Sequence, residues 1–473
     1  MRSRVVITGL GIVSPIGIGV SDFWKAALAG QSGISAITSF DPFPMDGYRS
    51  KVAGQVRDFA IERFVDSIHG QRVDRYAQFA LVATKEALVD SGLQMAKENP
   101  HRVGVIVGAG MGGMVMGERE ITQLYQQQKP HRVHPNFIPV ITLNSASGIL
   151  AIAYGAKGPN LTISTACSSS AHALGQALHC IREGRADVVI TVGADASITP
   201  LVFAGFCSLR ALSSKFNDHP EKASRPFDRL RDGFIMGEGA GTLILESAAH
   251  AKKRKAKVYA EIAGYAATSE AYHMVIPREN GLEVAHTMRL ALADAGVTPA
   301  QVGYINAHAT STTIGDAVEA RAIRQLFKSR ADKIAISATK SLIGHTLGAA
   351  GAIGGIASVL ALHTGQIHPT ANYDDPDPAC ALAGLSRSTQ ERRVKVALLN
   401  GLFEHPAMRS PVSIPQRRCC CQIQRRSARP PSHDAPALIG RVLPAHKPDL
   451  GHHSWRSDES GPCGGPAPRR CPR

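Results

Sequence analysis

Short runs of β-branched and apolar residues recur along the first 400 residues and alternate with longer segments of helical apolar spacing. Apolar residues at helical spacing predict helices at Phe79–Ser91 and Ala171–Ile181, and Gly92 and Gly184 are typical helix stops. The short runs lie between glycine-containing turns and predict buried strands at Val5–Thr8, Val103–Val107, Leu161–Ser164, Val188–Val192 and Gly241–Leu245. This alternation indicates an α/β fold around a largely buried sheet.

A second series of elements begins near Tyr259 and repeats the order of the first. Its pattern predicts a helix at Leu282–Ala295, strands at Tyr304–Ala307 and Ile334–Ser337, and then a helix rich in glycine and alanine. The repetition indicates two related α/β halves, which we expect to meet at about residue 255.

The character of the chain changes after Asn400. Residues 401–473 hold 12 of the 28 prolines and five of the nine cysteines, and they carry +7 of the formal net charge of +15. Apolar periodicity stops there, and such a segment buries too little apolar surface to offset the entropy of ordering it. We therefore assign residues 1–255 and 256–400 to the two halves and expect the tail to be disordered.

The overall composition is that of a globular enzyme, with 44% hydrophobic and 19% charged residues. The segment Met1–Gly11 breaks into threonine and glycine after three apolar residues, which is too short for the core of a secretory signal, so we expect a cytoplasmic location. Glycines interrupt the apolar stretch Ala349–Leu362, so we expect no membrane span. The mildly basic body suits an acidic partner without requiring nucleic acid.

The cysteines of the body show neither a CxxC pair nor a metal-ligand spacing with histidine. We therefore expect no metal site, no cofactor and no disulfide in the body of the chain. The residues concerned are Cys167, Cys180, Cys207 and Cys380.

Cys167 is the first candidate catalytic residue. In Leu161–Ile181 (LTISTACSSSAHALGQALHCI) a β-type run meets this cysteine and continues directly into a helix, which places Cys167 at a strand-to-helix turn. The free N–H groups and the positive dipole at a helix N-terminus favour a thiolate, the form that attacks carbonyl carbons. The small residues 168–171 leave room for a substrate. Taken alone, a cysteine in an apolar context is more often a structural core residue.

Two further segments each bring a histidine to a position where ligands bind. His308 follows a strand and precedes a polar loop in Tyr304–Asp316 (YINAHATSTTIGD), although a single loop histidine is more often structural. The segment Lys340–Gly351 (KSLIGHTLGAAG) carries Lys340 and His345 after a strand, at the start of a helix almost free of bulk. Close helix packing explains its glycines but not His345.

Together these three segments resemble the β-ketoacyl-acyl-carrier-protein synthases of the thiolase superfamily, and most closely the type II elongating ketosynthases. The resemblance covers about residues 3–400 and extends through Val5–Pro15, Pro200–Ser213 and Ala223–Gly241 (ASRPFDRLRDGFIMGEGAG). It implies a thiolase-like, five-layered αβαβα fold of two related halves and a homodimer.

The resemblance also implies the chemistry of the site. Cys167 matches the nucleophile, which takes an acyl group from an acyl-carrier protein, and His308 and His345 match the pair that stabilises the enolate formed when malonyl-carrier protein loses carbon dioxide. Lys340 matches the lysine of the KxxxGHxxGAAG segment, and Glu319 matches an acidic position that typically contacts it. Supporting positions are Thr310 and Thr312. The implied activity is decarboxylative condensation to a 3-oxoacyl-carrier protein in fatty acid elongation.

The chain departs from the family pattern in two places. Ala309 stands where the family usually has glycine, and at a positive φ an alanine costs about 1 kcal/mol or more and tilts His308. After Val394–Asn400, which predicts the last approaching strand, GLFEHPAM replaces a motif like NSFGFGGxNA. We therefore expect the chain beyond about residue 400 to be an out-of-frame or recombined extension, with a central strand and one oxyanion donor missing and the activity impaired.

Two alternatives remain open from the sequence. A type II polyketide or specialised lipid ketosynthase would use the same chemistry on other chains. A non-catalytic partner subunit of a ketosynthase heterodimer would lack the nucleophile, so Cys167 argues against it.

Overall fold

The structure is a computed structural model that describes residues 3–38, 40, 44–65, 72–401 and 404–409. These residues belong to one compact unit, Met1–Ser413. The predicted disorder of the tail therefore concerns residues that, apart from 401 and 404–409, lie outside the described part of the chain.

The strands of the first half form where the β-branched runs predicted them. Their bounds are β1 Val5–Ser14, β5 Val103–Gly108, β6 Asn160–Ile163, β7 Val188–Asp195 and β8 Gly239–Ser247. Four of them are buried along almost their whole length, whereas β6 is partly exposed because it is the last strand of the sheet and has a single neighbour, β5. The expectation that Leu161–Ser164 is a buried strand is therefore wrong for its burial, although the strand exists.

The second half repeats the pairing pattern of the first. In each half, two antiparallel pairs are followed by two parallel pairs, in the orders β1-β8-β7-β5-β6 and β9-β15-β14-β10-β11. The antiparallel pair β1–β9 joins the two halves into one sheet. The strands of the second half are β9 Ala260–Ala267, β10 Tyr304–Asn306, β11 Ala335–Ser337, β14 Val396–Leu399 and β15 Glu404–Arg409.

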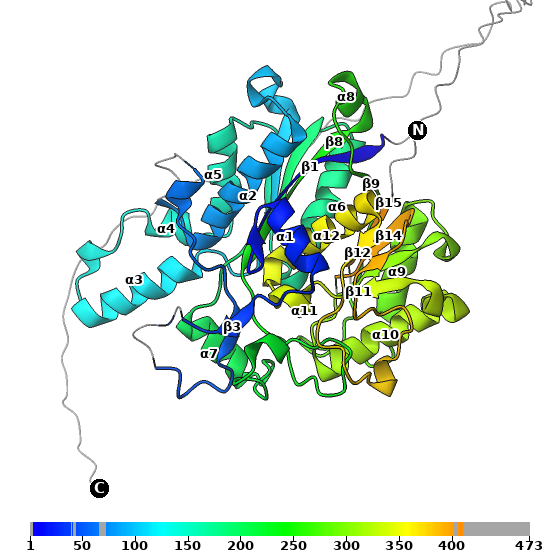
Figure 1. The fold of residues 1–473 in the computed structure, drawn as a ribbon. Coiled ribbons are helices and arrows are strands. Elements are labelled where there is room, and N and C mark those ends of the chain that lie inside the picture. The colour runs from blue at the N-terminus through cyan, green and yellow to red at the C-terminus, as the bar shows by residue number, and fades with distance from the viewer. Residues whose placement is uncertain (1–2, 39, 41–43, 66–71, 402–403, 410–473) are drawn as a thin grey trace, which may run out of the picture. The chain divides into compact units, whose positions relative to one another are not determined.

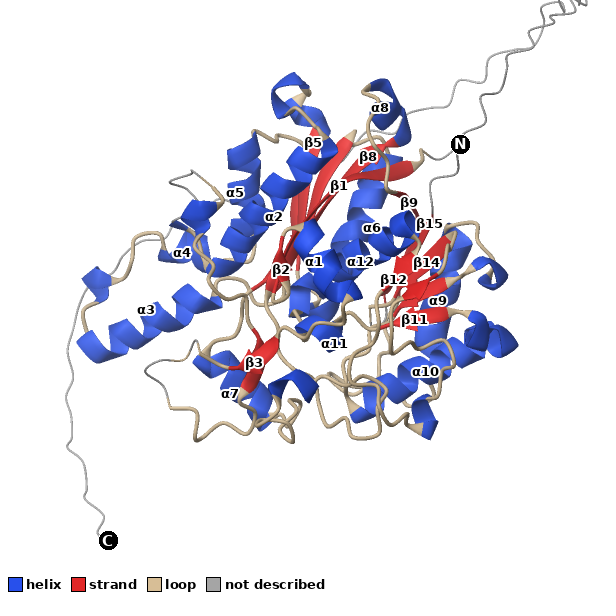
Figure 2. Ribbon diagram, viewed as in Figure 1, coloured by secondary structure: helices blue, strands red, loops and turns tan. Residues whose placement is uncertain are grey.

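Helices lie in three layers separated by the two halves of the sheet (Figures 1 and 2). One outer layer contains α2 (Arg75–Ser91) and α5 (Ser145–Tyr154), which pack on the strands of the first half. The other outer layer contains α9 (Leu282–Asp294), which packs on β9 and β15, and α10 (Thr313–Phe327), which packs on α9. The central helices α6 (Ser169–Arg182) and α12 (Ala350–Thr364) lie between the two sheet halves. The expected five-layered arrangement is confirmed.

The described residues also form six further α-helices and five short strands. The remaining helices are α1 Val20–Leu28, α3 Met114–Gln127, α4 Phe137–Ile141, α7 Pro200–Ser208, α8 Ala248–Lys253 and α11 Lys340–Ile343. The short strands are β2 Gly17–Ile18, β3 Ile34–Ala36, β4 Val52–Gly54, β12 Gln366–Ile367 and β13 Gln390–Glu391.

Small residues let the two central helices, α6 (Ser169–Arg182) and α12 (Ala350–Thr364), meet at their N-terminal ends. A Cβ atom on Gly351 would lie 2.6 Å from the backbone nitrogen of Ala171, and the backbone N–H of Ala352 donates to Ser170 Oγ at 2.9 Å. The interpretation that residues 168–171 leave room for substrate is therefore wrong. These residues are buried, and their small size allows the two helices to approach.

The apolar stretch that continues into α12 is a core element. Residues Leu347–Thr364 are long and apolar enough to span a bilayer by length and composition, but 83% of this stretch is buried inside the protein. Its apolar surface is thus already covered by the two halves of the sheet.

The expected loss of a central strand in the second half is wrong. β15 pairs with β14 on one side and with β9 on the other, in the same place that β8 occupies in the first half. Met408 of this strand is fully buried in the main apolar core. The segment lacks the family motif, yet residues 407–409 pair with both neighbouring strands and Met408 is buried in the core. Pro406, which has no backbone N–H, lies in the part of β15 that pairs with β9 alone.

The position of β15 predicts a large effect at Met408. Replacing Met408 by alanine should lower the free energy of unfolding by roughly 2–5 kcal/mol, because it removes buried methylene groups and leaves a cavity. The matched control is Met274→Ala, because Met274 is 95% exposed and should change stability little. Denaturant unfolding of both variants measures the difference, and equal stabilities would show that β15 is not part of the folded core.

Candidate active site

Cys167 lies at a tight strand-to-helix turn, as predicted. The chain leaves β6 at Ile163, makes one 3₁₀ turn at Ala166–Ser168 and enters α6 at Ser169. Ala166 has a positive φ of 53°, and the Ser169 hydroxyl holds the turn by donating to the carbonyl of Ala166 at 2.7 Å. The sulfur is therefore presented at the positive end of the α6 dipole, where negative charge is stabilised.

His345 brings its ring directly to this sulfur. His345 Nε2 lies 2.9 Å from Cys167 Sγ. The backbone of His345 is fixed on both sides, because its N–H donates to the carbonyl of Ile235 at 2.6 Å and its carbonyl accepts from the N–H of Gly237 at 2.9 Å. Phe234 packs edge-on against the ring, with 5.5 Å between the ring centroids.

The imidazole of His345 is neutral at physiological pH. Its pKa lies well below the usual value, first because the ring is fully buried and second because the positive charge of Lys340 is close. A neutral ring can take the proton of a thiol or donate a hydrogen bond to a thiolate, depending on its tautomer.

His308 is the second histidine of the site, and its ring centroid lies 5.6 Å from that of His345. It follows β10 directly, and its peptide groups are held by two buried ionisable side chains. The N–H of His308 donates to Glu319 Oε1 at 2.8 Å, and its carbonyl accepts from Lys340 Nζ at 2.7 Å. The structure thus brings together all four predicted catalytic residues.

Glu319, in α10, anchors the loop that carries His308. Its carboxylate also accepts from the N–H of Ala309 and from the side-chain amide of Asn400, each at 2.8 Å. Burial raises the pKa of Glu319, while these donors act to lower it. The contact with Lys340 that the resemblance implied is not a direct ion pair in the described structure. Both side chains instead bind the backbone of His308.

Ala309 adopts the strained conformation that its replacement of glycine suggested. Its φ is +41°, in the region where a residue with a Cβ atom costs roughly 1–2 kcal/mol. The two hydrogen bonds of Glu319 to His308 and Ala309 hold the peptide in place, so the strain is compensated locally.

Thr310 and Thr312 lie on the loop that leads from His308 to α10. Both are partly exposed, their hydroxyl oxygens are 3.1 Å apart, and neither lines the cavity at Cys167. Their predicted supporting role therefore stays a prediction.

A small cavity lies against the catalytic side chains. Polar groups from both halves line one part of it, and small or aliphatic residues of α12 and β14 line the rest. The lining includes Cys167, Asn306, His308, Thr339, Lys340, Ile343, Ala350, Ile353, Leu399, Asn400 and Gly401. Asn400 and Phe234 were not predicted as site residues, because the sequence pattern marks Asn400 only as the end of a strand and gives Phe234 no partner. The oxyanion donor that was expected to be missing falls near residues 402–403, outside the described chain.

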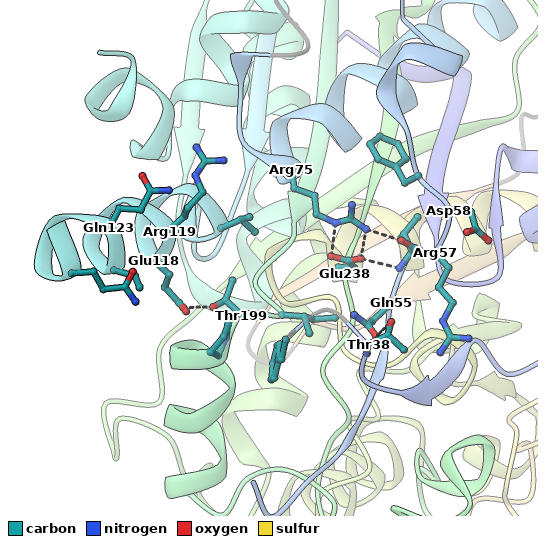
Figure 3. Close-up of a pocket in the computed structure, with 18 residues that line it drawn as sticks. Thr38, Gln55, Arg57, Asp58, Arg75, Glu118, Arg119, Gln123, Thr199 and Glu238 are labelled. Atoms are coloured by element: carbon teal, nitrogen blue, oxygen red, sulfur yellow. Dashed lines mark hydrogen bonds and ion pairs between the residues drawn. The ribbon is translucent and has the colours of Figure 1, made fainter. Parts of the chain in front are cut away.

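A larger cavity of about 1110 Å³ lies apart from these residues, between α3 and the segments around β4 and α7 (Figure 3). The Arg75–Glu238 ion pair, with atoms 2.7 Å apart, is part of its wall, and Glu118 on α3 binds Thr199. None of the predicted catalytic residues lines it. Three pairs of its polar side chains bind one another, namely Thr38 with Gln55, Arg75 with Glu238 and Glu118 with Thr199, and the size of the cavity alone does not make it the reactive centre. In the described residues, no cluster of three or more histidine, cysteine or acidic side chains is arranged to hold a metal ion.

Comparison with known proteins agrees with this geometry. The chain matches the family "Beta-ketoacyl synthase, N-terminal domain" over residues 2–251 and "Beta-ketoacyl synthase, C-terminal domain" over residues 259–374. The chain therefore belongs to the β-ketoacyl synthase family and is an acyltransferase of the condensing type. The predicted resemblance and enzyme class are confirmed.

Relatives named 3-oxoacyl-[acyl-carrier-protein] synthase 2 cover most of the chain. The relative from Coxiella burnetii is 44% identical over 399 residues, which are 84% of this chain and 95% of that protein. The relative from Synechocystis is 43% identical over the same shares.

Solved structures share the fold over the same region. A type II PKS ketosynthase in complex with its acyl-carrier protein has a TM-score of 0.80 at 35% identity, and covers 87% of this chain and 100% of its own. A β-ketoacyl synthase from Burkholderia phymatum has a TM-score of 0.79 at 30% identity with the same coverage.

The protonation of Lys340 predicts a pH dependence of the site. Burial lowers the pKa of Lys340 to about 8, although Glu319, Cys167 and Asp316 act to raise it. Since the charged ammonium donates to the carbonyl of His308, kcat should fall as the pH rises through about 8. In Lys340→Met, kcat should be lower by roughly 10-fold at neutral pH and should lose this alkaline fall.

The free energy of unfolding should change with pH in the opposite direction to kcat. The pKa of an unfolded lysine is about 10.4, so between about pH 8 and 10 the unfolded chain binds more protons and the free energy of unfolding rises with pH. Lys340→Met should lack this rise. The control is Lys85→Met, because exposed Lys85 also donates to a backbone carbonyl, that of Phe64 at 2.6 Å. Identical pH profiles of kcat for Lys340→Met and the unmodified protein would contradict the assignment.

Proposed function

We propose that this chain condenses an acyl group held on Cys167 with malonyl-acyl-carrier protein to give a 3-oxoacyl-acyl-carrier protein in fatty acid elongation. The observation that carries the proposal is the 2.9 Å contact between Cys167 Sγ and His345 Nε2, with the His308 ring 5.6 Å from the His345 ring. The names of the curated relatives support this choice of substrates.

In the first half-reaction, the sulfur of Cys167 attacks the thioester carbonyl of the acyl-carrier protein. The carbon–sulfur bond to the carrier breaks, and its thiolate leaves as the acyl group becomes attached to Cys167. The position of the sulfur at the start of α6 and the neutral ring of His345 both favour the attacking anion.

In the second half-reaction, the malonyl group loses carbon dioxide, and the electrons of the broken carbon–carbon bond form an enolate. The rings of His308 and His345 donate hydrogen bonds to the enolate oxygen and so lower the barrier to its formation. The enolate carbon then attacks the acyl carbon on Cys167, and the sulfur leaves. Lys340 and Glu319 keep His308 in place through its two peptide groups.

A polyketide or specialised lipid ketosynthase is the second candidate. It is favoured by the likeness to the type II PKS ketosynthase, whereas the curated relatives at 42–44% identity favour fatty acid elongation. The range of acyl chain lengths that the enzyme accepts on carrier proteins separates the two. The third possibility, a non-catalytic partner subunit, is disfavoured by the intact contact between Cys167 and His345.

The proposal predicts both an acylated intermediate and a condensed product. Incubation with acyl- and malonyl-acyl-carrier protein should acylate the peptide that contains Cys167 and yield the 3-oxoacyl product, as measured by mass spectrometry. Cys167→Ala should lower condensation by more than ~10³-fold, because no nucleophile remains. The control is Cys207→Ala, which removes a buried thiol of α7 that does not line the cavity at Cys167. Full condensation by Cys167→Ala would refute the mechanism.

The exposed edge of the sheet supports a homodimer. β6 is an edge strand with free backbone groups, and such edges readily pair with another chain. Leu161 on β6 is 44% exposed, and Ile152 on the neighbouring helix α5 is 67% exposed. A second copy related by a twofold axis would pair β6 with its own equivalent and cover both side chains.

This surface predicts the effect of charge at the edge. The double variant Ile152→Asp and Leu161→Asp should be monomeric, because it would bury four unpaired carboxylates in the dimer. Val89→Asp is the control, since Val89 is 75% exposed on the outer helix α2. Sedimentation analysis measures the mass in solution, and an unchanged dimer in the double variant would place the interface elsewhere.

A further inference from the structure

A buried carboxylate lies between the two catalytic segments and is not used by the proposed chemistry. Asp195 ends β7 and is fully buried. It accepts hydrogen bonds from the backbone N–H groups of Gly110 and Gly348, each at 2.9 Å, and from the hydroxyl of Ser197 at 2.8 Å. The glycine N–H groups bind Oδ2 of Asp195, whereas the N–H of Met111 approaches Oδ1 at 3.4 Å.

Neutral donors alone stabilise this charge, because the described structure gives Asp195 no ion pair with a lysine, arginine or histidine. Burial raises the pKa of its carboxyl group, and the hydrogen bonds from Gly348, Ser197 and Gly110 act to lower it. Burial of a carboxylate is costly unless several donors surround it. The donors that converge on Asp195 are therefore held in a definite arrangement.

One group of donors belongs to the loop beside the nucleophile. Gly110 and Met111 follow β5, and this loop runs along the segment that leads to Cys167. The N–H of Ala109 donates to the carbonyl of Ile163 at 3.1 Å, and Ser164 Oγ lies 3.4 Å from the carbonyl of Gly110.

The other donor belongs to the segment of the histidine. Gly348 lies in the 3₁₀ turn Leu347–Ala349, which follows His345 after a single residue, Thr346. This turn also packs against the 3₁₀ turn that contains Cys167.

Both glycines are required by the closeness of this arrangement. A Cβ atom on Gly348 would lie 2.3 Å from the nitrogen of Gly110, and one on Gly110 would lie 2.6 Å from Asp195 Oδ2. The N–H groups of both glycines therefore converge on Oδ2 of Asp195, and the two backbones lie too close for a side chain between them.

We infer that Asp195 is a positioning residue, whose carboxylate ties the Gly110 loop of the first half to the Gly348 turn of the second and thereby sets the distance between Cys167 Sγ and His345 Nε2. The inference rests on the proposed condensation and extends it to a residue that does not touch the reacting atoms. Asp195 acts through the backbone on either side of the nucleophile.

The strand pair β7–β8, which contains Asp195, also provides a matched control. Glu246 lies near the opposite end of β8 from Gly239, which pairs with Asp195. Glu246 is also fully buried and is held by Arg254, by His250 at 2.6 Å and by Thr8. Glu246→Gln therefore disturbs a buried carboxylate of the same sheet at a site remote from Cys167.

The test compares Asp195→Asn with Glu246→Gln by steady-state kinetics and thermal unfolding. An asparagine replaces one acceptor oxygen by an NH₂ group that faces N–H donors. In Asp195→Asn, kcat for condensation should fall by about 10²-fold, the loss expected for a misplacement of about 1 Å, while KM changes by less than about 3-fold. In Glu246→Gln, kcat should stay within about 3-fold of that of the unmodified protein, even if its melting temperature falls as far as that of Asp195→Asn.

A second readout separates positioning from general stability. Alkylation of Cys167 by iodoacetamide at neutral pH should be several-fold slower in Asp195→Asn than in Glu246→Gln, because the thiolate loses its contact with His345. Unchanged kcat and alkylation in Asp195→Asn would overturn the inference, as would equal losses in both variants. An unmodified protein that forms no condensed product would instead refute the proposed function, and the alkylation rates would still decide the role of Asp195.

Discussion

The contact between the sulfur of Cys167 and the ring of His345 depends on how closely two central helices approach. Cys167 belongs to the first half of the fold and His345 to the second, and their segments meet where the starts of α6 and α12 pack together. This approach is possible because Gly351 faces Ala171 without a side chain between them. A larger residue at either position would separate the nucleophile from its histidine, since close-packed interiors do not absorb added volume freely.

Around this contact, the protein buries several ionisable groups and satisfies them mainly with backbone groups. Lys340 and Glu319 bind opposite sides of the His308 peptide, and Asp195 gathers the N–H groups of two loops. Hydrogen bonds between an ionised side chain and a backbone group are short and strong, so each of these side chains fixes the backbone that it binds. The strained backbone of Ala309 persists for the same reason, because Glu319 accepts hydrogen bonds from the N–H groups of His308 and Ala309, which lead into the strained φ angle.

The segment after Asn400 shows how far a motif can be trusted as a sign of structure. The absence of the family's glycine-rich sequence suggested that the second half lacked a strand, yet β15 completes the sheet between β14 and β9. Apart from proline, backbone hydrogen bonding depends little on the side chain, so the two open strand edges accept a segment whose sequence differs from the family motif. A motif reports on the chemistry of particular side chains, whereas a sheet position is set by its neighbours.

The sequence by itself determined the elements and the identity of the reactive side chains. The β-branched runs located the strands that carry the site, because strand periodicity and helix stops are local properties. The catalytic set came instead from the resemblance of the segments around Cys167, His308 and His345 to the β-ketoacyl synthases, since Cys167 or His308 alone is more often structural. Tertiary structure alone decided that β15 is a central strand, that residues 168–171 pack against α12, and that Asn400, Phe234 and Asp195 surround the site. These relations join residues far apart in the chain, and their distances follow from packing, which no local pattern of residues encodes.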